Sequence, residues 1–287
     1  MDTAPCAAVF ACDMPCTNPV HAWQPFGYTD KGKMAPVFKM DKGNKYEPVQ
    51  LPCSKCPGCR ADQRRDWGVR CYHEAQQYTQ SSFLTLTYAN APPAINKRDL
   101  QLFLKRMRDN YGSLRYFACG EYGGKTNRPH YHMLIFGHDF MAGPHVAHID
   151  ADRYINARVE RTWGHGQVEI SSLTPDRCFY TAGYCMKKAG QADTFSIQSR
   201  KPPIGQRWLQ DNWDNLSRLG HVVIDGHVNP IPKVYFKWME QELEPVRLKK
   251  RQYLAKQSKA LQYQKLKSGE SRQINIAAKH SGKGETL

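Results

Sequence analysis

The chain has 287 residues, with 41 lysines and arginines against 26 aspartates and glutamates, so its formal net charge at pH 7 is +15. A protein this basic favours a polyanionic partner, and its 11% aromatic content suits stacking on unpaired bases, although a merely basic protein and an RNA-binding protein remain alternatives. No apolar run reaches the ~18 residues of a membrane span, and the N-terminus lacks the parts of a secretory signal, so we expect a cytoplasmic protein without membrane contact.

A cluster of cysteines follows a segment, residues 1–50, that shows no regular pattern and is expected to be irregular. Three cysteines stand at two-residue gaps: Cys53, Cys56 and Cys59. Cysteines in a cytoplasmic chain favour thiols or metal ligands over disulfides, and a Cys-x-x-Cys turn with proline and glycine is typical of a structural Zn²⁺ site. Cys16 is the candidate fourth ligand, with Cys71 and His21 as alternatives. Three reduced thiols in a tight loop and an iron–sulfur site are the competing interpretations.

The next three elements are expected in the order helix, strand, helix. Residues 60–79 predict a helix with a basic face, which either contacts a nucleic-acid backbone or is simply solvated. The arginines proposed for this contact are Arg60, Arg64 and Arg65. Residues 82–88 alternate and are rich in β-forming types, which predicts a strand with Phe83 and the threonines on opposite faces. Residues 97–111 predict an amphipathic helix.

Two further strands, residues 114–121 and 129–137, are separated by a polar loop with two glycines and should form a hairpin. His130 and His132 stand two residues apart on the second strand, so their side chains point to the same face. The hairpin would bring Glu121 beside His130. A glutamate and two imidazoles leave coordination positions open, as a catalytic metal needs. Half-exposed histidines or a polar core network would give the same pattern.

A pair of tyrosines marks the helix expected at residues 175–188, for which Thr174 is the N-cap. Tyr180 and Tyr184 are four residues apart and share a face, and Lys187 lies three residues further on the same side. Two phenols beside an ammonium suit a nucleophile that attacks a phosphodiester, with a cation to stabilise the developing charge. The alternative is two tyrosines that pack against the sheet with their hydroxyls at its rim.

A strand at residues 167–171 and the C-terminal segment complete the pattern. A helix is expected at residues 207–219, an Asp-Gly hairpin at residues 221–228 and a long helix from Lys233. Residues 241–287 read as a basic tail, helical and then disordered. Because strands and helices are mixed and two strands form a hairpin, we predict an α+β fold, with a central antiparallel sheet and flanking helices.

Three motifs occur in a specific order. They are a Phe-Leu-Thr-Leu-Thr strand from Phe83, Glu121 followed nine residues later by His130 within Pro-His-Tyr-His, and a Tyr-x-x-x-Tyr-x-x-Lys sequence from Tyr180 to Lys187. This order resembles the HUH endonucleases, and most closely the gokushovirus-type replication initiators of the Microviridae. The resemblance includes the cysteine cluster and covers roughly residues 14–240.

The resemblance implies a split β-α-β, RRM-like palm with the histidine pair on the central strand and the tyrosine helix beside it. Three residues would hold a catalytic Mg²⁺ or Mn²⁺, although two imidazoles also bind Zn²⁺ well: Glu121, His130 and His132. Tyr184 matches the nucleophile and Tyr180 the second tyrosine, and either could attack first. Lys187 matches a lysine that positions DNA or assists the tyrosine, and Lys188 beside it is a further candidate DNA contact.

The implied function is the initiation of rolling-circle DNA replication. One strand is nicked at a specific site through a 5′-phosphotyrosine and later joined, which releases circular single-stranded DNA. The implied partners are a single-stranded DNA origin and the helicase, polymerase and single-strand-binding protein of an infected bacterial host. No nucleotide cofactor is expected, because the phosphotyrosine conserves the bond energy and no P-loop sequence occurs.

Three parts are expected along the chain: residues 1–59 with the cysteine knuckle, residues 60–240 as the HUH endonuclease domain, and residues 241–287 as the tail. Two alternatives remain open. A relaxase or transposase would use the same chemistry on other DNA. A non-catalytic, zinc-containing DNA-binding protein would need the cysteines and the basic charge, but neither His130 nor Tyr184.

Overall fold

The computed structural model describes residue 16 and residues 18–25, 36–39, 43–124, 126–184 and 194–255. The described residues fall into two compact units, with those up to Asp62 in one and those from Gln63 onward in the other. Within the described ranges, none of the helices combines the length and the apolar character that crossing a bilayer requires.

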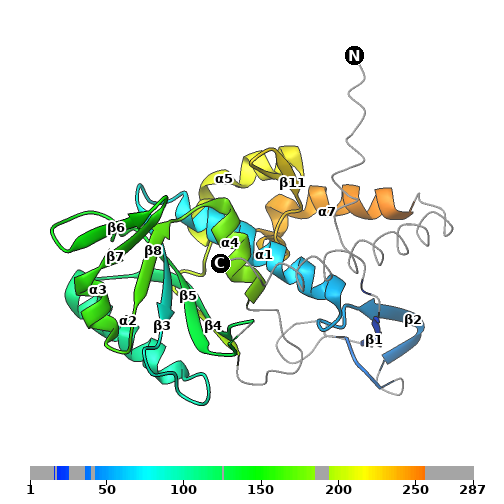
Figure 1. The fold of residues 1–287 in the computed structure, drawn as a ribbon. Helices are drawn as coiled ribbons and strands as arrows, with labels where there is room; N and C mark the ends of the chain where they lie inside the picture. The colour runs from blue at the N-terminus through cyan, green and yellow to red at the C-terminus, as the bar shows by residue number, and fades with distance from the viewer. Residues whose placement is uncertain are drawn as a thin grey trace. The chain divides into compact units, whose positions relative to one another are not determined.

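One antiparallel sheet forms the centre of the larger unit, with strand order β6-β7-β8-β3-β5-β4-β9 (Figure 1). Its strands are β3 (Ser81–Thr87), β4 (Arg115–Tyr122), β5 (Pro129–Phe136), β6 (Val146–Asp150), β7 (Arg153–Asn156), β8 (Val168–Ser172) and β9 (Phe195–Gln198). The sheet and the helices on its faces confirm the predicted α+β class. The histidine strand β5 is an interior strand, next to the central strand β3.

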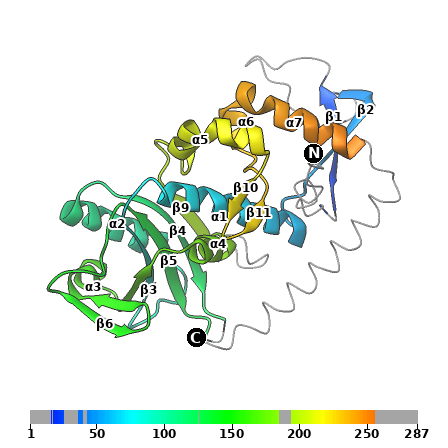
Figure 2. The ribbon, with the colours of Figure 1, turned by 90° about the horizontal axis from the view of Figure 1, so that it is seen from above.

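Helices cover both faces of this sheet. They are α1 (Pro57–Ala75), α2 (Lys97–Tyr111), α3 (Ala157–Trp163), α4 (Pro175–Tyr184), α5 (Gln206–Leu219), α6 (Tyr235–Trp238) and α7 (Glu240–Ala255). Figures 1 and 2 show α2 and α3 on one face of the sheet and α4 on the other. The apolar stripe of α2 packs under the sheet through four buried residues: Leu100, Phe103, Leu104 and Met107. The predicted bounds of α2 are confirmed, because Asn96 caps its start and Gly112, with φ 82°, ends it.

The opposite face packs against α4 and the part of α1 that belongs to the larger unit. Cys71 of α1 and Cys178 of α4 lie in one core with Phe117, Leu134 and Phe136 of the sheet. Strand alternation sends these sheet residues to the face that also carries His130 and His132, because all the residues of β5 with even numbers share one side. The tyrosine helix and the histidines therefore meet on the same face.

A second core joins α5, α6 and α7 with a short hairpin, β10 (Val222–Ile224) and β11 (His227–Asn229). Asp225 and Gly226 connect its strands with φ angles of 48° and 75°, so the predicted Asp-Gly turn is confirmed. The long helix expected from Lys233 is wrong in detail, because it is interrupted at Met239 between α6 and α7.

The smaller unit contains a feature that the sequence pattern did not indicate. Strands β1 (Val20–Pro25) and β2 (Gly43–Leu51) pair antiparallel, so the expectation of an irregular segment over residues 1–50 is wrong for these ranges. Both strands include proline, and neither shows a clear apolar alternation, so local pattern alone could not reveal them. The expected division of the chain at residues 59 and 240 stays a prediction. The residues of the tail beyond position 255 lie outside those described.

Candidate functional site

The β4–β5 hairpin brings a carboxylate against two imidazoles. Glu121 pairs directly with His130 across the two strands, as the sequence predicted, and His132 pairs with Cys119 on one side and Thr85 of β3 on the other. The Oε1 atom of Glu121 lies 3.0 Å from Nε2 of His130 and 3.3 Å from Nε2 of His132. One ligand atom from each of these three residues lies within 4.8 Å of the others, so the group could hold a metal ion.

The hydrogen bonds around this cluster bear on its fit to a cation. Nδ1 of His130 lies 3.2 Å from the carbonyl oxygen of Arg128, which can only accept, so Nδ1 carries a hydrogen. In the neutral ring, Nε2 then presents a lone pair to the oxygen of Glu121 at 3.0 Å. Two acceptors at that distance require a proton or a cation between them, so this donor set fits a metal ion.

The cluster is largely shielded from solvent. Glu121 and His132 are each 5% exposed, and the sheet and α4 surround them. Burial alone would raise the pKa of Glu121, but hydrogen bonds with His130 and His132 outweigh it and hold that pKa below its ordinary value. The glutamate is therefore a carboxylate at neutral pH, and it supplies a hard, charged oxygen ligand.

Helix α4 places both tyrosines against the second histidine. Thr174 caps the helix as predicted, since its Oγ1 accepts a hydrogen bond from the Arg177 N–H at 3.3 Å. The rings of Tyr180 and Tyr184 meet edge-on with centroids 4.4 Å apart, and the Tyr184 hydroxyl donates to that of Tyr180. Their centroids lie 5.4 Å and 5.0 Å from that of His132. The predicted common face is confirmed.

Both phenols are protonated at neutral pH. Burial raises the pKa of Tyr180, an effect partly offset by the hydrogen bond from Tyr184. Burial and the hydrogen bond to Tyr180 both raise the pKa of Tyr184. A tyrosine that acts as a nucleophile from this environment must therefore lose its proton as it attacks.

Two contacts hold α4 in this position. Gly68 of α1 has no side chain where a Cβ would lie 2.3 Å from the ring of Phe179, so the two helices approach closely. The Cys119 thiol of β4 lies 3.7 Å from the carbonyl oxygen of Thr181, to which it can donate. The tyrosines are thus fixed by packing that involves residues far from them in the sequence.

Strand β3 contributes two residues that the sequence interpretation placed wrongly. Phe83 and Thr85 share one face, contrary to the expectation, because residues two apart in a strand point the same way. Phe83 stacks on His132 with centroids 5.6 Å apart, and Oγ1 of Thr85 lies 3.2 Å from Nδ1 of His132. Together they fix the orientation of that imidazole.

A groove of about 1150 Å³ opens beside the cluster. His130, His132 and Tyr180 line it, as do four arginines: Arg64, Arg128, Arg153 and Arg177. Its two carboxylates are Glu169 and Asp176, so the side chains of the groove carry an excess of positive charge. Such a groove attracts a phosphate backbone.

Arg64 is the predicted basic residue that this groove contains. Its Nε donates to the carbonyl oxygen of Phe179 at 3.0 Å, and its guanidinium lies against Gly183, where an added Cβ would be 3.2 Å from its Cδ and Nε. Arg65 does not line the groove, and Arg60 belongs to the other unit. Lys187 and Lys188 lie outside the described residues.

Three arginines of the groove were not singled out from the sequence. Arg177 stands three residues before Tyr180 and so shares its helical face, and Arg128 stands two residues before His130; both spacings were visible signals. Arg153 lies on β7, in a segment where no strand was expected, so no local signal pointed to it.

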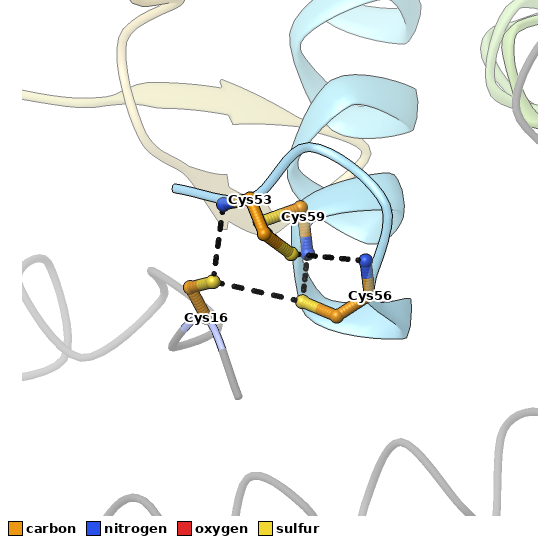
Figure 3. A group of neighbouring side chains, drawn as sticks. All are labelled: Cys16, Cys53, Cys56 and Cys59. Atoms are coloured by element: carbon orange, nitrogen blue, oxygen red, sulfur yellow. Dashed lines mark hydrogen bonds between the residues drawn. The ribbon is translucent and has the colours of Figure 1, made fainter. Parts of the chain in front are cut away.

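Four cysteines meet in the smaller unit (Figure 3). Cys16 joins the three expected thiols, and one sulfur atom from each residue lies within 4.8 Å of the others. Backbone N–H groups of Lys55 and Cys56 lower the pKa of the Cys53 thiol, whereas burial raises that of Cys59 to about 12. The group could hold a metal ion, and Cys16, rather than Cys71 or His21, is its fourth member.

Comparison with known proteins gives the chain a family. The model of the replication-associated protein family of the ORF2 type matches residues 81–189, a range that contains the glutamate–histidine cluster and both tyrosines. No solved structure matches the chain.

Three curated relatives are phage replication-associated proteins. The chain is 31% identical over 278 residues to replication-associated protein VP4 of Bdellovibrio phage phiMH2K, covering 86% of each protein. It is 28% identical over 218 residues to replication-associated protein ORF2 of Spiroplasma virus 4, covering 67% of this chain and 68% of the relative. It is 31% identical over 155 residues to replication-associated protein ORF4 of Chlamydia phage 1, covering 48% and 38%. The chain therefore belongs to the replication-associated proteins of Microviridae-type phages.

Proposed function

We propose that this protein initiates rolling-circle replication as an HUH-type nickase that cuts one DNA strand at a specific site and later joins the ends. The observation that supports this most is the contact of Tyr180 and Tyr184 with His132, at a cluster that Glu121 and His130 complete. A nucleophile and a potential metal site thus share one groove. Family membership supports the role in replication.

Glu121, His130 and His132 would hold the catalytic Mg²⁺ or Mn²⁺. The charged oxygen of the glutamate suits either ion, and the facing acceptor atoms of Glu121 and His130 suit any divalent cation. When bound, such an ion draws charge from a non-bridging phosphate oxygen in the transition state. The protein's own contribution is to hold the three ligands on one rigid sheet face.

The cutting step is an in-line displacement by a tyrosine hydroxyl. The phenolic oxygen forms a bond to phosphorus as the bond from phosphorus to the 3′ oxygen breaks. The nucleophile loses its phenolic proton, and the departing 3′ oxygen takes up a proton and becomes a free hydroxyl. Tyr184 is the first candidate, because the motif places Lys187 three residues beyond it, and Tyr180 is the alternative.

The joining step uses the same bond in reverse. A 3′-hydroxyl attacks the phosphotyrosine, and the tyrosine leaves with a proton, so no nucleotide cofactor is needed. The other tyrosine can cut a regenerated site at the same time, since the two hydroxyls are in contact. A host polymerase, helicase and single-strand-binding protein would carry out the synthesis between the two events.

The substrate that fits the groove is single-stranded DNA. Four arginines line it, and Arg64 lies nearest to the tyrosine helix through its bond to Phe179. Phosphate groups that follow these guanidinium groups would pass the cluster with the scissile bond accessible to Tyr180 or Tyr184. Arg65, Lys187 and Lys188 remain candidates for further backbone contacts.

The test is adduct formation on single-stranded oligonucleotides tiled across the DNA that encodes the protein. With Mn²⁺, one oligonucleotide should give a band of slow migration on a denaturing gel. The band should vanish with EDTA and in His132→Ala, and it should depend on one tyrosine. DNA binding without an adduct on any oligonucleotide would contradict the proposal and favour a non-catalytic DNA-binding protein, which the four-cysteine group and the basic charge would also suit.

A further inference from the structure

The four cysteines of the smaller unit form a group that nicking chemistry does not use. The Sγ atoms of Cys53 and Cys59 lie 3.9 Å apart, as do those of Cys16 and Cys56 (Figure 3). A disulfide would bring two sulfur atoms to about 2.05 Å. Four thiolates around one ion at a Zn–S distance of about 2.3 Å have tetrahedral edges of roughly 3.8 Å. The spacing is therefore that of a single tetrahedral ion.

We infer that Cys16, Cys53, Cys56 and Cys59 bind one structural Zn²⁺, whose ligation holds the smaller unit together. Four thiolates fill the tetrahedron and leave no open position, which distinguishes structural from catalytic zinc. A [4Fe–4S] cluster attaches each cysteine to a different iron and would spread the sulfur atoms further apart. This inference does not rest on the proposed nicking activity.

The local backbone is arranged for thiolates. The Cys56 N–H donates to the sulfur of Cys53 at 3.3 Å, and the Cys59 N–H donates to the sulfur of Cys56 at 3.4 Å. Ser54 has a φ of 61°, in the left-handed region, and this turn brings Cys53 and Cys56 to the same side. Such N–H bonds to ligand sulfurs lower the charge that the ion must neutralise.

The first turn of α1 adds a further stabilising interaction. Pro57 begins the helix, which contains no acidic residue in its first turn, and Cys59 lies within that turn. A site of one zinc and four thiolates carries a net charge of −2, and the positive end of the helix dipole stabilises it. The sulfur of Cys56 occupies the place of an N-cap acceptor.

The smaller unit needs such a crosslink. Among its described side chains, only Ala22 and Cys59 are buried and apolar, and none belongs to the three hydrophobic clusters of the described chain. A two-stranded hairpin is marginal by itself. Cys16 lies 37 residues before Cys53, so the ion would close a long loop, which is where a crosslink restricts an unfolded chain most.

The first test is the metal content of the full-length protein, purified with a reducing agent and without added metal. Elemental analysis should find stoichiometric zinc in the parent protein and in His132→Ala, which removes a ligand of the other cluster. The Cys56→Ser variant should bind zinc at least about 100-fold more weakly in competition with a chromophoric chelator, because even the loss of a group behind a ligand costs about 10- to 100-fold. Cys71→Ser, a cysteine of α1 outside the group, should keep the metal.

A second measurement keeps the inference open to refutation if Cys56→Ser is poorly soluble. Zinc-free parent protein titrated with Co²⁺ should develop the intense visible absorption of a tetrahedral thiolate site, and Zn²⁺ should abolish it. Zinc-free protein should also lose protection from proteolysis in residues 16–59. Absence of stoichiometric zinc together with no cobalt spectrum, equal zinc in Cys56→Ser, zinc lost in His132→Ala, or purified protein coloured by iron would each overturn the inference. None of these readouts involves DNA, so failure of the nicking assay leaves them unaffected.

Discussion

Oε1 of Glu121 and Nε2 of His130 face each other at 3.0 Å across the β4–β5 pair, although the hydrogen bond of Nδ1 to Arg128 makes Nε2 an acceptor in the neutral ring. The contact is unfavourable unless a cation or a proton lies between the two atoms. The hairpin loop that separates these residues in the sequence thereby creates a ligand pair, and the first prediction concerns it.

Glu121→Gln should raise the Mn²⁺ concentration for half-maximal adduct formation by at least about tenfold, because a neutral amide oxygen replaces a charged ligand. The measurement is the initial rate of adduct formation against Mn²⁺ concentration. Glu169→Gln, a groove carboxylate outside the cluster, is the matched control and should leave the midpoint unchanged. An equal metal dependence in parent and Glu121→Gln would remove Glu121 from the site.

Tyr184→Phe and Tyr180→Phe should have unequal effects on the first cut. Each keeps the ring that packs against His132 and removes one hydroxyl of the pair, at a cost in stability of about 1 kcal/mol. The variant of the first nucleophile should give no adduct, whereas the other should give an adduct within about tenfold of the parent rate but fail to release joined circles, since loss of one general interaction costs less than loss of the nucleophile. Single-turnover assays on an origin oligonucleotide and on a circular template separate the two outcomes. Tyr116→Phe, on β4 outside the groove, serves as control, and adducts of normal yield from both tyrosine variants at once would fit a single shared role rather than two distinct ones.

Gly183→Ala should weaken the binding of single-stranded DNA without loss of stability. An added Cβ would stand 3.2 Å from Cδ and Nε of Arg64, so the guanidinium must move, while alanine favours the helix by about 1 kcal/mol over glycine. Fluorescence anisotropy should show a weaker dissociation constant, and thermal unfolding an equal or higher Tm.

Arg64→Gln should go further and reduce the slope of log K against log salt by about 1, the change expected for the loss of one phosphate contact. Arg65→Gln, the neighbouring arginine that does not line the groove, is the control. An unchanged salt slope in Arg64→Gln would show that this guanidinium serves packing against α4 rather than DNA.

His73 should make the stability of the larger unit depend on pH. It is buried, stacks on Trp208 with centroids 3.4 Å apart, and contacts the Tyr235 hydroxyl through Nδ1 at 3.0 Å. Burial lowers its pKa from 6.5 to about 3. Between these two values the unfolded chain binds a proton that the folded protein excludes, so the contribution of His73 is complete above pH 6.5 and is lost as the pH falls towards 3.

The measurement is urea unfolding of the parent and of His73→Gln between pH 7 and pH 4. The free energy of unfolding of the parent should fall relative to that of the variant by up to ~1.4 kcal/mol per pH unit, which removes the contribution of carboxylates common to both. His227→Gln, an exposed histidine on β11, should follow the parent. Parallel curves for the parent and His73→Gln would mean that His73 is already charged in the folded state.

Local physics accounts for the parts of the site that the sequence predicted. The period of two in β5 is enough to place His130 and His132 on one face, and the glycine loop is enough to return Glu121 beside them. Capping by Thr174 and the 3.6-residue period are enough to align Tyr180 with Tyr184. Each of these relations involves residues within about one hairpin or three helical turns of one another.

The tertiary structure alone decided which surfaces meet. Nothing within α4 specifies that its tyrosines cover His132, since that contact depends on Gly68, Phe179 and the face of the sheet left open by α2. Likewise only the folded chain brings Arg64 to the groove and Cys16 to Cys53. Backbone periodicity and turn chemistry act between near neighbours and can be read from a sequence, whereas the choice of packing partner depends on burying apolar faces contributed by distant segments.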